Sequence, residues 1–310
     1  MNSEAPLQPQ RNVTRENAKS AARRLLHASG LTAGIRYWYR NGLRIIMYHR
    51  FPLRSELEAQ CEHLKKHYRP VSLSEVSESI ARRKLLPPRP VVITVDDGYR
   101  DFMVNAWPIL KAWSIPALVY VATDLPDHHT WLWTDQLRHF LVQQGDNAAA
   151  TTIVERLKKV PDEQRRAYLA SLPGLRTTPP PDYEPLTWDE IRTLADEGVE
   201  FGAHTRTHPI LSRLENRDRM REEIAGSKAR LEEELKTPVV HFCYPNGTPG
   251  DYNDEVVDVV RECGFQTAVT ALRGINPTGT NPLLLRRIHQ EPTRHVSAFA
   301  HQVAGLYRHA

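Results

Sequence analysis

The feature that most constrains this chain is a regular alternation of short apolar runs with longer helical patterns. Seven runs have the length and composition of buried strands: 43–48, 91–95, 117–122, 199–202, 239–243, 267–270 and 283–288. Helical patterns lie between them, at 57–68, 105–113, 188–197 and 218–235. The run VVITV at 91–95 is rich in the β-branched residues that strands favour. This alternation predicts an α/β fold with a mostly parallel sheet or barrel.

Two of the helical patterns carry finer signals. Thr187 is the predicted N-cap of the helix at 188–197, and Glu190, three residues on, completes a capping box. The helix at 218–235 has an apolar stripe that we expect to face the core, formed by Met220, Ile224, Leu231 and Leu235.

The alternation breaks between about residues 124 and 186. This stretch contains WLW at 131–133, a charged helical pattern at 146–172 and the turn-rich sequence TTPPPDYEP. We interpret it as an insertion of loops and helices over one face of the fold. The main domain is therefore predicted to span residues 43–310, with the insertion inside it.

Residues 1–42 precede the first strand. Residues 1–17 are polar and predict an irregular arm, whereas 18–40 predict a basic helix with interruptions at Gly30 and Gly34. This helix carries three consecutive aromatic residues, Tyr37 to Tyr39. One interpretation is peripheral contact with a membrane surface or a partner. The other is a helix that closes one end of the fold.

Composition excludes several classes of protein. The 310 residues include 41 basic and 37 acidic ones, and the net charge of +4 is too small to indicate nucleic-acid binding. Three cysteines without a CxxC pair indicate neither a disulfide framework nor a zinc ribbon. No secretory signal or run of about 18 apolar residues is present. We therefore expect a cytoplasmic protein, with the inner face of the membrane as an alternative location.

Two adjacent carboxylates, Asp96 and Asp97, end the strand at 91–95 and are followed by Gly98. In parallel α/β folds, catalytic groups gather at the carboxyl ends of strands. A glycine at this point allows a sharp exit of the chain. The alternative is a solvated Asp-Asp-Gly turn without a function.

Two histidines, His204 and His208, follow another short apolar run and are four residues apart. On a helical turn, positions i and i+4 share one face, so both imidazoles would reach one metal ion. The alternative is a pair of surface histidines.

The two segments together predict a catalytic metal site. Two imidazoles and one carboxylate make a three-ligand site with an open position for water, and the second carboxylate is then free to act as general base. This ligand set suits zinc, with cobalt, manganese and iron as alternatives.

These segments resemble the motifs of the polysaccharide deacetylases, the NodB-homology group of carbohydrate esterase family 4. VDDGYRD at 95–101 resembles the TFDDG motif, and AHTRTHPILS at 203–212 resembles the H-[ST]-x-x-H motif. HFCYPNG at 241–247 resembles an F-x-YP-x-G variant of the third motif, and LRRIHQ at 285–290 resembles the late active-site segment. IIMYHRF at 45–51 also matches many bacterial members. The resemblance runs from about Leu43 to His289, in the order of the family.

The resemblance implies a distorted (β/α)7-type barrel and assigns roles to the site residues. It implies Asp97, His204 and His208 as metal ligands and Asp96 as the base. A backbone N–H in the turn formed by Tyr244, Pro245, Asn246 and Gly247 would bind the oxyanion together with the metal.

The chain departs from the pattern at two points. Many members have an arginine in the third motif that orients the base, and here that position is Cys243. We hypothesise that Arg287 replaces it, because an Arg fork binds a carboxylate through two donors. His289 is the candidate general acid, although its spacing is unusual, and the alternative is an exposed histidine without a role. His49 is a lesser candidate, which would otherwise line the sugar site or pack against Tyr48.

The predicted function is N-deacetylation of N-acetylhexosamine units in a surface or exported polysaccharide or a saccharide intermediate. One alternative keeps the metal site but acts on a non-sugar amide or a cyclic imide. The other is a non-catalytic carbohydrate-binding relative. Three tryptophans are expected either to stack on sugar rings or to anchor loops to the core: Trp131, Trp133 and Trp188.

Overall fold

The computed structural model describes residues 31–53 and 55–306. The predicted polar arm at 1–17 and the part of the predicted basic helix before residue 31 lie outside these ranges. Seven parallel strands close into a barrel because β1 pairs with both β3 and β8. In chain order these strands are β1 (Arg44–Tyr48), β3 (Pro90–Val95), β4 (Ala117–Val121), β5 (Glu200–Ala203), β6 (His241–Cys243), β7 (Thr267–Arg273) and β8 (Leu285–His289). The predicted (β/α)7-type barrel is confirmed.

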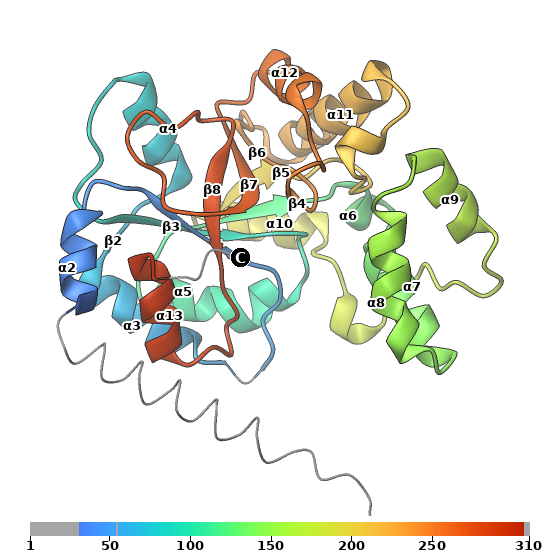
Figure 1. Cartoon of the computed structure of the whole chain (residues 1–310), viewed down its shortest axis with the longest axis horizontal. Coiled ribbons are helices and arrows are strands. Elements are labelled where there is room, and N and C mark those ends of the chain that lie inside the picture. Colours follow the sequence, from blue (N-terminus) through green and yellow to red (C-terminus); the bar gives the residue numbers. More distant parts are fainter. Residues whose placement is uncertain (1–30, 54, 307–310) are drawn as a thin grey trace, which may run out of the picture.

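Helices cover the outside of the barrel (Figure 1). They are α2 (Leu31–Trp38), α3 (Leu57–His67), α4 (Leu73–Ala81), α5 (Trp107–Ala112), α10 (Trp188–Asp196), α11 (Arg217–Leu235), α12 (Asp254–Glu262) and α13 (Val296–Ala304). A two-residue strand, β2 (Arg69–Pro70), pairs with the start of β3. None of the described helices combines the length and the apolar character that a membrane span requires.

The strands bury both of their faces, which explains their apolar sequences. In β3, Val92 packs in a core cluster with Ile45, Tyr120 and Cys243. Val91, Ile93 and Val95 of the same strand pack in a second cluster with the covering helices. Alternate residues of one strand therefore belong to different layers, as the pleat requires.

Several local predictions can be compared with the structure. Thr187 and Glu190 form the predicted capping box at the start of α10. The helical pattern at 105–113 becomes a π-helix, Phe102–Ala106, followed by α5, and Pro108 lies in the first turn of α5, where proline is tolerated. The pattern at 146–172 divides into two helices, α8 (Asn147–Leu157) and α9 (Asp162–Ala170), and Pro161 is the N-cap residue of the second.

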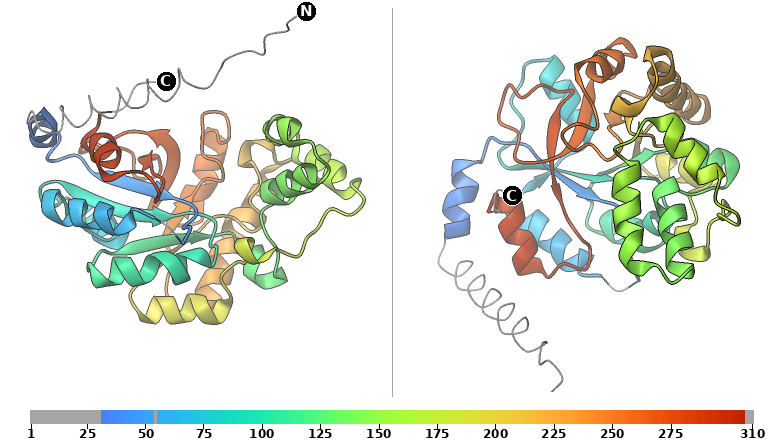
Figure 2. Two further views of the ribbon diagram at one scale, coloured as in Figure 1. Left: turned by 90° about the horizontal axis from the view of Figure 1, so that it is seen from below. Right: turned by 45° about the vertical axis from the view of Figure 1, so that its right-hand side comes forward.

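Residues 124–186 form a group of helices on one side of the barrel (Figures 1 and 2). They comprise α6 (Asp124–His128), α7 (Trp133–Gln143), α8 (Asn147–Leu157) and α9 (Asp162–Ala170). α7 and α8 share a small core of their own, which contains Leu137, Leu141, Val154 and Leu157. This group therefore has a small core of its own and also packs on the barrel, where Leu125, Trp131 and Leu132 belong to one apolar cluster with Tyr99 and Ala122.

Candidate metal centre

Asp96 and Asp97 both face the carboxyl end of the barrel, although they are adjacent in sequence. Alternate side chains of a strand point to the same side, so Asp96 points to the barrel interior, as Val92 and Thr94 of β3 do. Asp97 would point outward on a regular strand. Its backbone instead adopts the left-handed conformation, with φ of +78°. This turn brings both carboxylates to one centre, where they are 3% and 7% exposed.

His204 and His208 also meet at this centre, but not on a helical turn. His204 directly follows β5, and residues 204–208 form an irregular loop. The expected helical turn is therefore wrong. Left-handed backbone at Thr205 and at His208, with φ of +65° and +58°, folds the loop back so that both imidazoles face inward.

A buried glutamate from α11 holds this histidine loop in shape. Glu223 accepts hydrogen bonds from the N–H groups of Arg206 and Thr207, both at 2.9 Å, and from the Thr207 hydroxyl at 2.7 Å. The His208 N–H donates to Thr205 Oγ1 at 3.0 Å. The loop conformation is thus fixed by side chains rather than by regular secondary structure.

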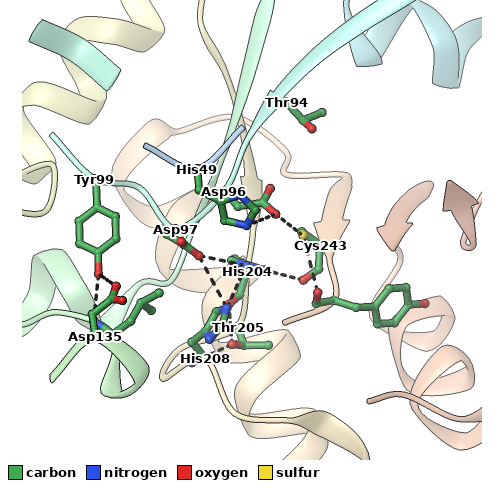
Figure 3. A network of polar contacts seen from close by, with 12 residues as sticks. His49, Thr94, Asp96, Asp97, Tyr99, Asp135, His204, Thr205, His208 and Cys243 are labelled. Carbon is green, nitrogen blue, oxygen red and sulfur yellow. Dashed lines mark hydrogen bonds and ion pairs between the residues drawn. The ribbon is translucent and has the colours of Figure 1, made fainter. Parts of the chain in front are cut away.

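The three candidate ligand atoms have the separations expected around one metal ion. His204 Nε2 and His208 Nε2 are 3.2 Å apart, and they lie 3.5 and 3.7 Å from Asp97 Oδ1 (Figure 3). Ligands about 2.1 Å from a tetrahedral zinc ion would be about 3.4 Å from one another. His204 Nδ1 donates to the Cys243 carbonyl at 2.8 Å, which leaves Nε2 with a free lone pair. The triad therefore fits a divalent metal.

A second group, Asp96, His204 and Cys243, also has ligand atoms within 4.8 Å of one another. Its chemistry is less suited to a cation. The Arg287 guanidinium lies 3.2 Å from the Cys243 sulfur and binds both oxygens of Asp96. Burial raises the pKa of the Cys243 thiol, which keeps it protonated. Of the two groups, Asp97, His204 and His208 have the chemistry that suits a divalent cation.

Arg287 binds Asp96 as a fork. Nη1 donates to Oδ1 at 2.6 Å and Nη2 to Oδ2 at 2.7 Å, while Nε donates to the Thr270 carbonyl at 2.8 Å. Burial alone would raise the pKa of Asp96, but the Arg287 guanidinium more than offsets this and lowers it well below its ordinary value. Asp96 is thus held ionised and fixed in orientation.

At this separation, His204 and His208 cannot both be in the doubly protonated, positively charged form. Burial and the neighbouring His204 lower the pKa of His208 to about 3. Neutral imidazole is the form that binds a metal, so His208 is in the ligating form at neutral pH. Burial alone would lower the pKa of His204, but the neighbouring Cys243 and Asp97 raise it well above its ordinary value, so His204 would release a proton when a metal binds.

The turn Tyr244–Gly247 borders the centre, and most of its N–H groups are already used. The Tyr244 N–H donates to Val269, the Gly247 N–H donates to Pro245, and Pro245 has no N–H. Gly247 has φ of +60°, and a Cβ there would lie 2.9 Å from the Ala271 nitrogen, so no other residue fits. Among the residues of this turn, Asn246 has the one backbone N–H without a hydrogen bond to another backbone group.

His49 and His289 lie together at the mouth of the site. Their ring centroids are 5.6 Å apart, and His49 Nε2 lies 3.8 Å from Asp96 Oδ2. His289 Nε2 is 3.2 Å from Glu291 Oε1. Burial and the neighbouring His49 lower the pKa of His289. Both imidazoles thus line the space above Asp96.

All predicted site residues except Pro245 and Gly247 line one cavity of about 520 Å³. One side, the barrel wall, consists of the strand-end residues described above. The other side, the insertion wall, was not predicted from the sequence, and its lining residues are Leu132, Thr134, Asp135, Arg138, Lys158 and Tyr183. Tyr99, just after the Asp pair, links the two walls, because its hydroxyl donates to Asp135 Oδ2 at 2.7 Å.

The three tryptophans do not line this cavity. Trp131 and Trp133 are buried, with indole N–H groups that donate to the carbonyls of Arg176 and His208. The Trp188 N–H donates to Asp127, and Arg230 stacks on its ring. They therefore anchor loops, as one of the two interpretations expected.

Comparison with known proteins gives a consistent result. Residues 83–268 match the family model described as polysaccharide deacetylase. The Bacillus subtilis protein YxkH is 22% identical over 273 residues, which cover 85% of this chain and 77% of that protein. The poly-beta-1,6-N-acetyl-D-glucosamine N-deacetylase of Escherichia coli is 40% identical over 65 residues, which cover 21% of this chain and only 10% of that protein.

Solved structures share the architecture. The Streptococcus pyogenes deacetylase PplD in complex with acetate has a TM-score of 0.62 at 20% identity, with 85% of this chain and 99% of that chain covered. IcaB from Ammonifex degensii has a TM-score of 0.61 at 21% identity, with 86% and 97% covered. At these identities the likeness shows a common fold.

Proposed function

Since this chain belongs to the polysaccharide deacetylase family, we propose that it is a metal-dependent hydrolase that removes N-acetyl groups from N-acetylhexosamine units of a saccharide or polysaccharide. The observation that carries the proposal is the joint position of two groups at the floor of one cavity. These groups are the Asp97, His204 and His208 triad and the carboxylate of Asp96, which Arg287 holds. Such an arrangement serves hydrolysis better than structural metal binding, which closes all ligand positions.

Asp97, His204 and His208 would hold a divalent metal, which supplies Lewis-acid polarisation of the amide carbonyl and lowers the pKa of a bound water. Zinc suits these nitrogen and oxygen ligands, and cobalt, manganese and iron are the alternatives. Asp96 accepts the proton that the attacking water loses. Arg287 lowers the pKa of Asp96 and so makes it a weaker base. Asp96 would therefore accept a proton readily only from a water whose own pKa is lowered.

The remaining roles fall to groups around the cavity. The Asn246 N–H stabilises the oxyanion that forms when water adds to the carbonyl. His289 donates a proton to the leaving amine, so that acetate and a free amino sugar are released. Burial and His49 lower its pKa, which makes the protonated imidazole a stronger acid, and Glu291 beside it offsets part of this shift. Tyr244 and His49 shape the sugar site.

The decisive experiment measures acetate release from a panel of N-acetylated oligosaccharides by protein loaded with zinc. We expect release from at least one saccharide, its abolition by chelation, and its recovery on addition of zinc. Asp96→Asn should bind the metal but release no acetate. The parallel variants His289→Gln and His49→Gln separate the two imidazoles, and the general acid is the one whose loss lowers kcat more.

Other outcomes would favour the alternatives. Hydrolysis of a cyclic imide or a simple amide, without activity on any saccharide, would favour a non-sugar substrate. Saccharide binding without acetate release in the presence of zinc would favour a non-catalytic carbohydrate-binding protein. Either result would overturn the proposal.

We also propose that the protein acts in the cytoplasm and contacts the inner face of the membrane through α2. Tyr37, Trp38 and Tyr39 are 67%, 81% and 45% exposed, and Arg40 packs on the Tyr37 ring. Aromatic and basic side chains of this kind suit an anionic bilayer surface. Co-sedimentation with anionic vesicles should fall when Trp38 is changed to Ser, and equal recovery of both proteins would contradict the contact.

A further inference from the structure

The insertion wall places a carboxylate and a guanidinium side by side in the cavity. Asp135 and Arg138 are one turn apart on α7, and Arg138 Nη1 donates to Asp135 Oδ1 at 3.0 Å. The Asp135 side chain is only 16% exposed, whereas that of Arg138 is 43% exposed. Both line the same cavity as the metal triad.

Two hydrogen bonds fix this pair relative to the metal centre. The Tyr99 hydroxyl, two residues after Asp97, donates to Asp135 Oδ2 at 2.7 Å (Figure 3). At the start of the same helix, the Trp133 indole N–H donates to the His208 carbonyl at 3.1 Å. α7 is thus attached to both segments that supply metal ligands, and Asp135 has a defined position beside them.

The pair retains unused hydrogen-bonding capacity. Oδ2 of Asp135 accepts the bond from Tyr99, Oδ1 accepts the bond from Arg138, and each oxygen has a further lone pair. A guanidinium has five N–H donors, and one of those of Arg138 goes to Asp135. A carboxylate next to a guanidinium therefore presents acceptors and donors within one helical turn.

Sugars have the complementary chemistry, because neighbouring ring hydroxyls each donate and accept a hydrogen bond. Hydrogen bonds that involve a charged partner are roughly twice as strong as neutral ones. We propose that Asp135 and Arg138 form a subsite that binds two neighbouring hydroxyl groups of the sugar ring that carries the acetamide. This inference rests on the proposed function and deepens it, since it assigns the preference for a sugar over a simple amide to the insertion.

If Asp135 only anchored α7 to the barrel, a guanidinium beside it in the cavity would not be required. The bond from Tyr99 ends at Asp135, and among the described residues the hydrogen bond of Arg138 goes to Asp135 and not to the barrel. The chain also contains a matched structural pair for comparison. Asp258 and Arg261 on α12 have the same i,i+3 spacing, are 53% and 57% exposed, and lie outside the cavity.

The test compares two substrates. One is an N-acetylhexosamine disaccharide, and the other is an N-alkylacetamide without hydroxyl groups. For the disaccharide, Asp135→Asn and Arg138→Gln should each raise KM and lower kcat/KM by about 10- to 100-fold. For the alkyl amide, both variants should match the wild type within about twofold, and the control Asp258→Asn should be unchanged with both substrates.

A second measurement does not require turnover. In zinc-loaded Asp96→Asn protein, calorimetry should show a disaccharide Kd that rises by a similar factor when Asp135→Asn is added. Equal losses with both substrates, or an unchanged Kd, would overturn the subsite. If the wild type releases no acetate, the proposed function fails, but the binding measurement still decides whether the subsite exists.

Discussion

The two walls of the cavity are built in different ways. The barrel wall places its chemical groups at the ends of buried strands, and Asp96, His204 and Arg287 are each 2–3% exposed. The insertion wall places its groups on helices with a small core of their own, and Arg138 on α7 has a side chain that is 43% exposed. The difference indicates that the groups proposed to act on the reacting atoms need the rigid barrel. The groups proposed to bind the sugar can lie on helices that have a small core of their own.

This contrast predicts different kinetic consequences. Changes at the metal triad, at Asp96 or at Arg287 in the barrel wall should affect metal binding or kcat, because the proposed mechanism places these groups at the reacting atoms. Changes in the insertion wall should affect KM, because the groups there contact the bound sugar. A change in a cavity-lining residue of the insertion wall that lowers kcat and leaves KM unchanged would break the comparison.

The largest effect is expected for loss of a metal ligand. His208→Ala removes one of three ligands, so bound zinc should fall far below one ion per chain and kcat/KM should drop by at least about 10³-fold. Metal analysis and acetate release measure the two quantities. His128→Ala changes an exposed histidine of the insertion and should leave both unchanged. Full zinc content with full activity in His208→Ala would disprove the assignment.

The next largest effect is expected at Arg287. In Arg287→Met, the Asp96 carboxylate stays buried without its partner, which should lower the free energy of unfolding by about 3–5 kcal/mol. kcat should fall by about 10²- to 10⁴-fold, because the base is no longer oriented. Chemical denaturation and acetate release provide the measurements.

Two further variants make the Arg287 result specific. Arg287→Lys keeps the charge but not the two-pronged geometry, so it should recover part of the stability and little of the activity. Arg286→Met, at the exposed neighbouring position, is the control and should behave like the wild type. Wild-type kcat in Arg287→Met would show that Arg287 does not orient the base.

The sequence predicted the barrel wall far better than the insertion wall. Apolar runs located all seven strands because the strands bury both faces, and Asp96 and His204 were found because they directly follow such runs. Asp135 and Arg138 gave no signal, because their place in the cavity depends on contacts between α7 and the distant His208 carbonyl. Tertiary contacts of this kind leave no local pattern.

The histidine loop shows a different limit. The spacing of His204 and His208 suggested a helical turn, but the loop is irregular and two of its residues have positive φ. Non-glycine residues seldom adopt this conformation, so the sequence offers no sign of it. Glu223 on α11 stabilises the loop from a position at least 15 residues away along the chain.

A smaller effect should connect the two walls. Trp133→Phe removes the N–H that donates to the His208 carbonyl, so the histidine loop should lose some of its fixed geometry. Supporting contacts of this kind typically change metal affinity by 10- to 100-fold, and we expect a loss of about 10-fold in zinc affinity. Trp131→Phe is the matched control, because its N–H donates to Arg176 rather than to the metal loop. Equal zinc affinities in the two variants would show that the insertion does not support the metal centre.

The smallest effect concerns acid, which should destabilise the barrel through its buried histidine. His241, at the start of β6, contacts the hydroxyls of Ser74 and Thr267, and burial lowers its pKa to about 4. The unfolded chain, with a pKa of about 6.5 for this group, binds the proton first, so folding stability falls as the pH drops below about 6.5. Between pH 7 and pH 5.5, the contribution of His241 to the free energy of unfolding should fall by about 1 kcal/mol.

Denaturation of the wild type and of His241→Gln at both pH values measures this contribution, because the difference in unfolding free energy between the two proteins should shrink by this amount. A constant difference for His241→Gln would mean that its imidazole is protonated in the folded barrel as readily as in the unfolded chain.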